Sequence, residues 1–108
     1  MKTIGPRERS AILLARYVHL GQIGGAEAAA FHARMRGVSA RDIRSLLAGG
    51  VPDDRDLAAL VAATWLVLDS KGRLANDDVE DLREAGVERI NLLEVIALVG
   101  AEFEPAGV

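Results

Sequence analysis

The sequence predicts an all-α protein built from about six helices. Half of the residues are hydrophobic but only 4% are aromatic, so the apolar share consists mainly of Ala, Leu and Val, which favour helices over strands. Glycine and proline divide the chain into segments of ordinary helix length. In the central segment, apolar residues recur at helical spacing. At 108 residues, the chain is expected to form a single domain over residues 1–108.

The first helix is predicted to run from about Arg7 to Leu20. Pro6 stands just before it, and proline is favoured in the first turn of a helix because its missing N–H has no intrahelical partner there. Three glycines follow closely and are expected to break the helix: Gly21, Gly24 and Gly25.

The second helix is predicted from about Ala26 to Arg36. Gly37 follows it, a residue suited to the left-handed conformation just past a helix end. Ser39 is expected to cap a third helix, ARDIRSLLAG, through its hydroxyl, and Gly49 is expected to close that helix.

The fourth helix shows the clearest periodicity. Asp53 or Asp54 is expected to cap it, and Lys71-Gly72 to end it. Its apolar residues are spaced at i, i+3, i+4, i+7, i+8 and i+11, which predicts one stripe facing a core: Leu57, Leu60, Val61, Thr64, Trp65 and Leu68.

Two further helices complete the chain. Asn76 is expected to cap a short fifth helix that ends at Gly86, and a sixth is predicted from about Ile90 to Phe103. The sixth has apolar residues on more than one face, so we expect it to be buried on most sides, centrally or against another subunit.

The chain also shows signs of an internal repeat. Gly37-Val38 and Gly86-Val87 lie 49 positions apart and are followed at equal offsets by apolar residues. The two halves are therefore interpreted as one three-helix unit used twice, or as the similarity that any two helix–glycine–helix junctions share. A solenoid is disfavoured because solenoids need about three or more repeats.

Composition excludes several functions. The chain has no cysteine, so it holds no disulfide, thiolate metal site or thiol chemistry. Net charge is −3, which gives no reason to expect a nucleic-acid partner. No apolar run approaches the roughly 18 residues that cross a bilayer, and the N-terminus does not resemble a secretion signal. We therefore expect a cytoplasmic protein with no membrane partner, no bound metal and no cofactor.

Three stretches carry a family resemblance. The opening PRERSAILLA, then RGVSARDIRSLL, then the segment from Asp54 through LANDDVEDLREAGVERINLLEVIALVG occur in the order and spacing of the AhpD-like family of alkylhydroperoxidases and carboxymuconolactone decarboxylases. The chain resembles this family over about residues 6–103. The resemblance implies an all-helical bundle that assembles as a trimer or hexamer.

The resemblance also implies where a redox site would lie. The family's peroxidases carry Cys-x-x-Cys at a helix start, a His four residues after the second Cys and a Glu about twelve before the first. Counting back from Gly37 places Gln22 and Gly25 at the cysteine positions, Ala29 at the His and Ser10 at the Glu. A register shifted by three places Gly25 and Ala28 at the cysteines, His32 at the His and Leu13 at the Glu. Neither register supplies a thiol, so cysteine-based peroxidase activity is excluded.

Other residues remain as candidates for chemistry. Glu27 and His32 lie near the site implied by the resemblance, but their separation of five places them about 140° apart around a helix. Each also has a structural interpretation: Glu27 stabilises a helix start, His32 lies on a surface or interface, and His19 caps the first helix. A metal site from Glu27, His32 and His19 lacks a recognised ligand spacing. Four clustered arginines are candidates to hold a carboxylate, and the alternatives are that they form a solvated face or pair with Asp42: Arg34, Arg36, Arg41 and Arg44.

Two classes of function follow from these observations. The first is a non-catalytic relative of the family whose fold serves binding or self-assembly, with a small-molecule ligand as a candidate. The second is a cysteine-independent decarboxylase or isomerase that moves protons on a small carboxylated substrate, with Glu27 and His32 or His19 as proton carriers. Convergence of these three residues on one closed cavity would favour the enzyme.

Overall fold

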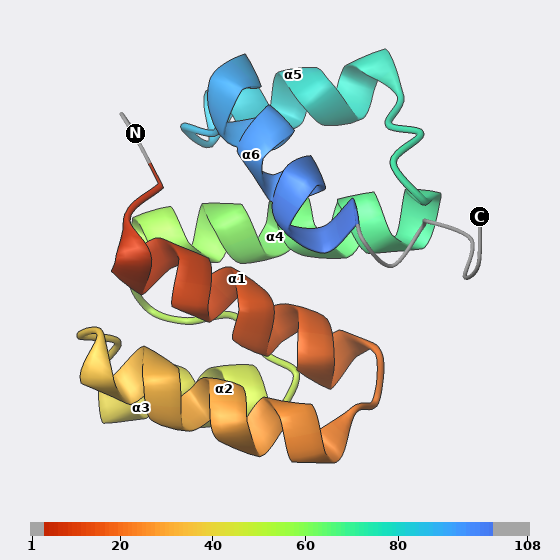
Figure 1. The fold of residues 1–108 in the computed structure, drawn as a ribbon. Helices are drawn as coiled ribbons and strands as arrows, with labels where there is room; N and C mark the ends of the chain where they lie inside the picture. The colour runs from red at the N-terminus through yellow and green to blue at the C-terminus, as the bar shows by residue number, and fades with distance from the viewer. Residues whose placement is uncertain (1–3, 101–108) are drawn as a thin grey trace.

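The computed structural model describes residues 4–100, which form six α-helices and no strand (Figure 1). The all-α prediction with about six helices is therefore confirmed for this part of the chain. The helices are α1 (Pro6–His19), α2 (Ile23–Met35), α3 (Ala40–Leu47), α4 (Arg55–Ser70), α5 (Asn76–Glu84) and α6 (Arg89–Val99). None of them is both long enough and apolar enough to cross a membrane.

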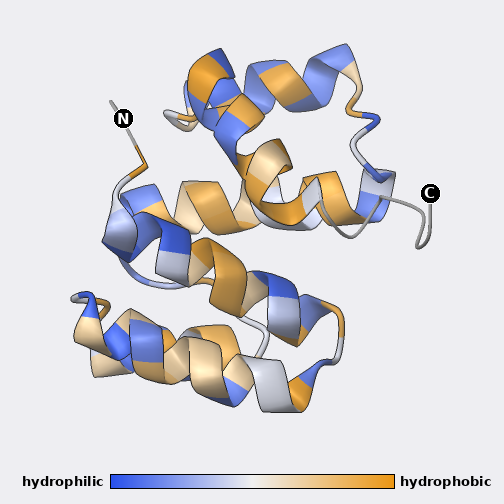
Figure 2. Cartoon of the chain, in the orientation of Figure 1, coloured by the Kyte–Doolittle hydropathy of each residue, from blue (hydrophilic) through white to orange (hydrophobic). Residues whose placement is uncertain are grey.

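The helices form two groups of three that meet where α1 lies against α4 (Figure 1). Helices α1, α2 and α3 enclose one core, and α4, α5 and α6 enclose most of the other. The stripe predicted on α4 supplies both cores, because Leu60 packs in one and Leu57 in the other. All six stripe residues are buried or partly buried, and α4 and α6 are apolar along much of their length (Figure 2).

Helix boundaries repeat at the offset of 49 seen in the sequence. Helices α1 and α4 begin 49 positions apart, as do α3 and α6. Gly37 and Gly86 both adopt positive φ, +100° and +102°. The core positions that follow them are buried in both halves: Val38 and Val87, Ile43 and Leu92, Leu46 and Val95. These agreements favour a duplicated unit over a chance similarity between two junctions.

Most helix ends lie where local chemistry predicted them. Pro6 occupies the first turn of α1. The Ser39 hydroxyl accepts a hydrogen bond from the Asp42 backbone N–H at 3.1 Å, and so caps α3. Of the two aspartates proposed for α4, Asp54 is the cap, since its Oδ1 accepts from the Leu57 N–H at 3.1 Å.

Two boundaries were predicted wrongly. Helix α2 begins at Ile23, so Gly24 and Gly25 lie inside its first turn and do not break the chain. Glycine lowers helix stability by only about 1 kcal/mol, a cost that packing against α1 can offset. The cap of α5 is Ala75, and Asn76 is the first helical residue. The predicted end of the sixth helix at Phe103 lies outside the described residues.

Helix α6 is not buried on most sides within the single chain, so a central position is wrong and burial against another subunit stays a prediction. Val95 and Val99 are fully buried, whereas Ile90 is 59% exposed and Leu93 is 55% exposed. Helix α2 likewise leaves large apolar side chains in solvent, with Ile23, Phe31 and Met35 each more than 60% exposed.

Candidate functional site

The three candidate proton carriers line three different pockets. His32 lines a pocket between α1 and α2, Glu27 lines one beside the turn that joins these helices, and His19 lines one against α4. The convergence on one cavity that would have favoured the enzyme is therefore not found. Glu27 and His32 project from different faces of α2, and His19 lies at the end of α1 that faces α4. Among residues 4–100, no group of three His, Asp or Glu side chains is placed to hold a metal ion.

The α1–α2 pocket coincides with the site that the family resemblance implied. It has a volume of about 270 Å³. Its lining includes Ser10, Gly25 and Ala29 of the first register, and Leu13, Gly25, Ala28 and His32 of the second. Only Gln22 of the carried-over positions is outside, in the pocket that Glu27 lines. Positions that are far apart in the sequence thus meet in one cavity.

Polar side chains give this pocket a chemistry of its own. Ser10 is buried, and its hydroxyl accepts a hydrogen bond from Arg36 Nη1 at 3.3 Å. His32 and Tyr17 complete the polar lining. A guanidinium, an imidazole, a phenol and a hydroxyl can all donate hydrogen bonds, so the pocket offers several donors to an anion.

Tyr17 occupies the space beside Gly25, the position to which both registers of the resemblance assign a cysteine. A Cβ atom added to Gly25 would be 2.5 Å from Cδ1 and 2.6 Å from Cε1 of the Tyr17 ring. No side chain fits at position 25 while the ring stays in place. The Arg16 guanidinium lies over the Tyr17 ring, 5.5 Å from its centre, at a distance suited to a cation–π contact.

Sequence reasoning did not identify Tyr17, and it found Arg36 only as one member of an arginine cluster. That cluster does not act as a unit. Arg36 lines the α1–α2 pocket, whereas Arg41 pairs with Asp53 at 2.9 Å. The expected partner Asp42 is buried and accepts a hydrogen bond from the Asp53 backbone N–H at 2.8 Å. A helical wheel of α1 that placed Ser10, Leu13 and Tyr17 on one face would have been the available signal.

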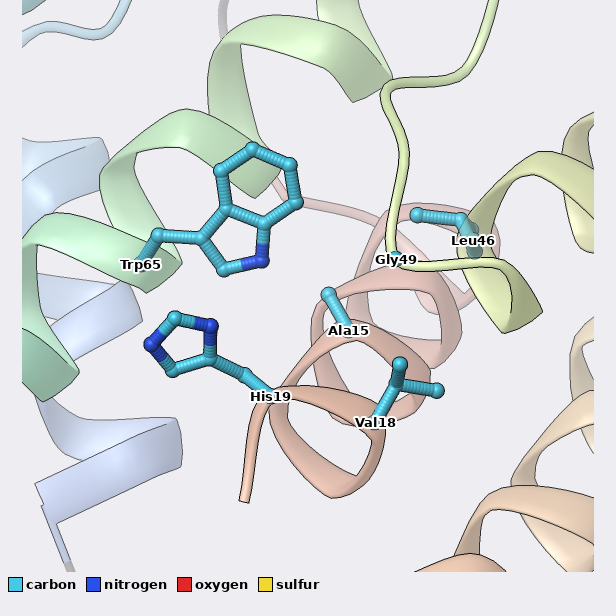
Figure 3. Close-up of a pocket in the computed structure, with 6 residues that line it drawn as sticks. All are labelled: Ala15, Val18, His19, Leu46, Gly49 and Trp65. Atoms are coloured by element: carbon cyan, nitrogen blue, oxygen red, sulfur yellow. The ribbon is translucent and has the colours of Figure 1, made fainter. Parts of the chain in front are cut away.

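His19 has a partner that the sequence could not reveal. Its Nε2 lies 2.7 Å from Oδ1 of Asp69, fifty positions further along the chain on α4. Its ring also stacks on Trp65, with centroids 6.2 Å apart and planes inclined by 22°. His19 thus joins the end of α1 to α4. The pocket beside it has a volume of about 230 Å³ (Figure 3).

Comparison with known proteins adds no relative. Neither the protein-family models, nor the curated proteins, nor the solved structures give a match to this chain. The geometry of the pockets and the resemblance noted in the sequence are therefore the basis for any assignment of function.

Proposed function

We propose that this chain is a cysteine-free relative of the AhpD-like family whose α1–α2 pocket binds a small anionic molecule. One observation carries the proposal: all of the positions to which the resemblance assigns redox residues, except Gln22, line a single pocket, and that pocket contains Arg36, His32 and Tyr17. Positions spaced by three and four share one face of α2 in any register, so the informative part is that Ser10 and Leu13 of α1 face them across the same pocket.

The lining favours an anion with a small apolar body. Arg36 supplies a permanent positive charge and a planar set of donors that suits a carboxylate. Leu13, Ala28 and Ala29 supply apolar walls. A volume of about 270 Å³ suits a molecule somewhat larger than a benzene ring, which fits a cavity of about 150 Å³.

Peroxide reduction does not fit this pocket. The family's peroxidases depend on a thiolate, and this chain contains no cysteine. In addition, the Tyr17 ring fills the space beside Gly25 that a cysteine side chain would need. The residues that replaced the redox pair thus form a binding surface of a different kind.

Binding of a panel of small carboxylates, each paired with its neutral amide, tests the proposal by calorimetry. Charge-assisted hydrogen bonds contribute about 1.5–3 kcal/mol, so Arg36→Gln is expected to weaken carboxylate binding by roughly 10- to 150-fold. Arg34→Gln changes an exposed arginine two residues before Arg36 that lies outside the pocket, so it is the matched control and is expected to bind as the parent does. Equal binding of acids and amides, or equal loss in both variants, would contradict the proposal.

A second candidate function is proton transfer on a small carboxylated substrate. The observation that favours it is that His32 and Tyr17, two groups that can exchange protons, share the pocket with Arg36. Glu27 and His19 have no part in this version. If it holds, His32→Asn abolishes turnover of a carboxylated lactone while binding persists. A ligand that binds and is never converted, even at high protein concentration, leaves the chain as a binding protein.

We also propose that copies of this chain assemble, as a trimer or hexamer according to the resemblance. The support is the pair of exposed apolar surfaces on α2 and α6, formed by Ile23, Phe31 and Met35 and by Ile90 and Leu93. Light scattering after size exclusion measures the assembly directly. Phe31→Glu or Leu93→Glu is expected to lower the measured mass to that of a monomer, whereas a monomeric parent protein would refute assembly.

A further inference from the structure

A second pocket, separate from the proposed anion site, lies between α1, α4 and the end of α3. Its walls are the aliphatic side chains of Ala15, Val18 and Leu46, with Gly49 at one side and the rings of His19 and Trp65 at the other (Figure 3). None of these residues lines the α1–α2 pocket. The proposed function therefore does not depend on it.

His19 is held in one orientation beside this pocket. A carboxylate can only accept, so the contact of 2.7 Å to Asp69 Oδ1 requires that His19 Nε2 carry the hydrogen. In the neutral imidazole, Nδ1 is then the acceptor. Stacking on Trp65 fixes the plane of the ring. Asp69 and Trp65 thus orient His19 so that the neutral ring presents Nδ1 as a hydrogen-bond acceptor in a fixed direction.

Trp65 supplies the complementary group. Figure 3 shows the indole nitrogen on the edge of the ring that faces Ala15 and Gly49, with the imidazole of His19 alongside. Within residues 4–100, neither the Trp65 indole N–H nor His19 Nδ1 has a hydrogen-bond partner. The pocket therefore presents one free donor and one free acceptor next to three aliphatic side chains.

A hydroxyl satisfies both atoms through a single oxygen, because that oxygen donates one hydrogen bond and accepts others. An apolar body is needed to cover the aliphatic walls. The volume of about 230 Å³ exceeds the roughly 150 Å³ that holds benzene, so a single ring with a substituent fits. We propose that this pocket binds a small apolar alcohol or phenol, whose hydroxyl donates to His19 Nδ1 and accepts from the Trp65 indole N–H.

Charged ligands suit this pocket poorly. A carboxylate has no hydrogen to donate to Nδ1, and the neighbouring Asp69 would repel it. An ammonium cannot accept from the indole N–H. The ligand class of this pocket thus differs from that of the anion site, although α1 lines both.

The test uses the whole chain and compares hydroxyl compounds with matched hydrocarbons. Trp65 is the one tryptophan in the sequence, so its fluorescence and its indole N–H resonance report on this pocket. Phenol and toluene form one pair, and cyclohexanol and methylcyclohexane the other. Two hydrogen bonds of about 0.5–1.5 kcal/mol each predict that the hydroxyl compound binds roughly 5- to 150-fold more tightly. The hydroxyl compound with the higher affinity, phenol or cyclohexanol, identifies a phenol or an aliphatic alcohol as the preferred class.

Variants separate this pocket from other sites. His19→Phe keeps an aromatic ring on Trp65 but removes the acceptor, so phenol affinity is expected to fall several-fold while toluene affinity stays the same. Val18→Phe fills the cavity and is expected to abolish binding of both. Arg36→Gln, which alters the anion site, is expected to leave both affinities unchanged. Equal affinities for phenol and toluene, undiminished binding in Val18→Phe, or no binding by any of the four compounds would overturn the proposal.

Discussion

Two neighbouring glycines at the start of α2 are expected to respond in opposite ways to the same substitution. Gly24 and Gly25 both lie in the first turn, where alanine is a better helix former by up to about 1 kcal/mol. A Cβ at position 24 meets no atom within 4 Å. A Cβ at position 25 lies 2.5 Å from the Tyr17 ring. The pair thus isolates the effect of the tyrosine.

The expected changes in the free energy of unfolding follow from the surroundings of the two glycines. Gly24→Ala is expected to stabilise the fold by about 0.5–1 kcal/mol. Gly25→Ala gains a similar amount from helix propensity, but overpacking costs about 1–3 kcal/mol, because Tyr17 must leave its place. The two variants should therefore differ in the free energy of unfolding by about 1–3 kcal/mol, with Gly25→Ala the less stable.

Urea unfolding followed by far-ultraviolet circular dichroism measures both variants at once. A third variant, Gly25→Ala in a Tyr17→Ala background, is expected to lose the penalty, since the clashing ring is gone. If Gly25→Ala stabilises the protein as much as Gly24→Ala does, the Tyr17 ring does not fill the space beside Gly25.

Three further predictions concern the fold. Asp54→Ala should lower the free energy of unfolding by about 1 kcal/mol at neutral pH, because α4 loses its cap. The backbone hydrogen bond from Leu57, and then Arg7, lower the pKa of Asp54, so the contribution of this cap is complete above about pH 4 and should vanish as the pH falls through the lowered pKa. Denaturation at a series of pH values checks this dependence. Leu60→Ala, at a fully buried position, should cost about 2–5 kcal/mol in the same unfolding assay, and a loss below 1 kcal/mol would contradict its place in the core. Gly86→Ala should cost about 1–2 kcal/mol because φ is +102° there, whereas Gly100→Ala, with ordinary φ, serves as its control.

Local chemistry made the helix ends readable from the sequence. Pro6, Ser39, Asp54 and Gly37 each act through a backbone group within a few residues, so their roles follow from the neighbouring sequence alone. Gly25 failed as a break signal for the opposite reason. Whether a glycine ends a helix depends on what packs against it. Here the Tyr17 ring lies so close to Gly25 that only a residue without a side chain fits inside the helix.

The candidate sites divide in the same way. The sequence by itself determined the all-helical class and the exclusion of thiol chemistry, and it indicated the repeat at 49 positions, since periodicity, spacing and the absence of cysteine need no knowledge of contacts. Only the tertiary structure decided that Glu27, His32 and His19 lie in three pockets, and that Arg36 joins His32. It also paired His19 with Asp69. The physical reason is that a side chain's direction around its helix, and the helix that faces it, depend on packing between segments that are distant in the sequence.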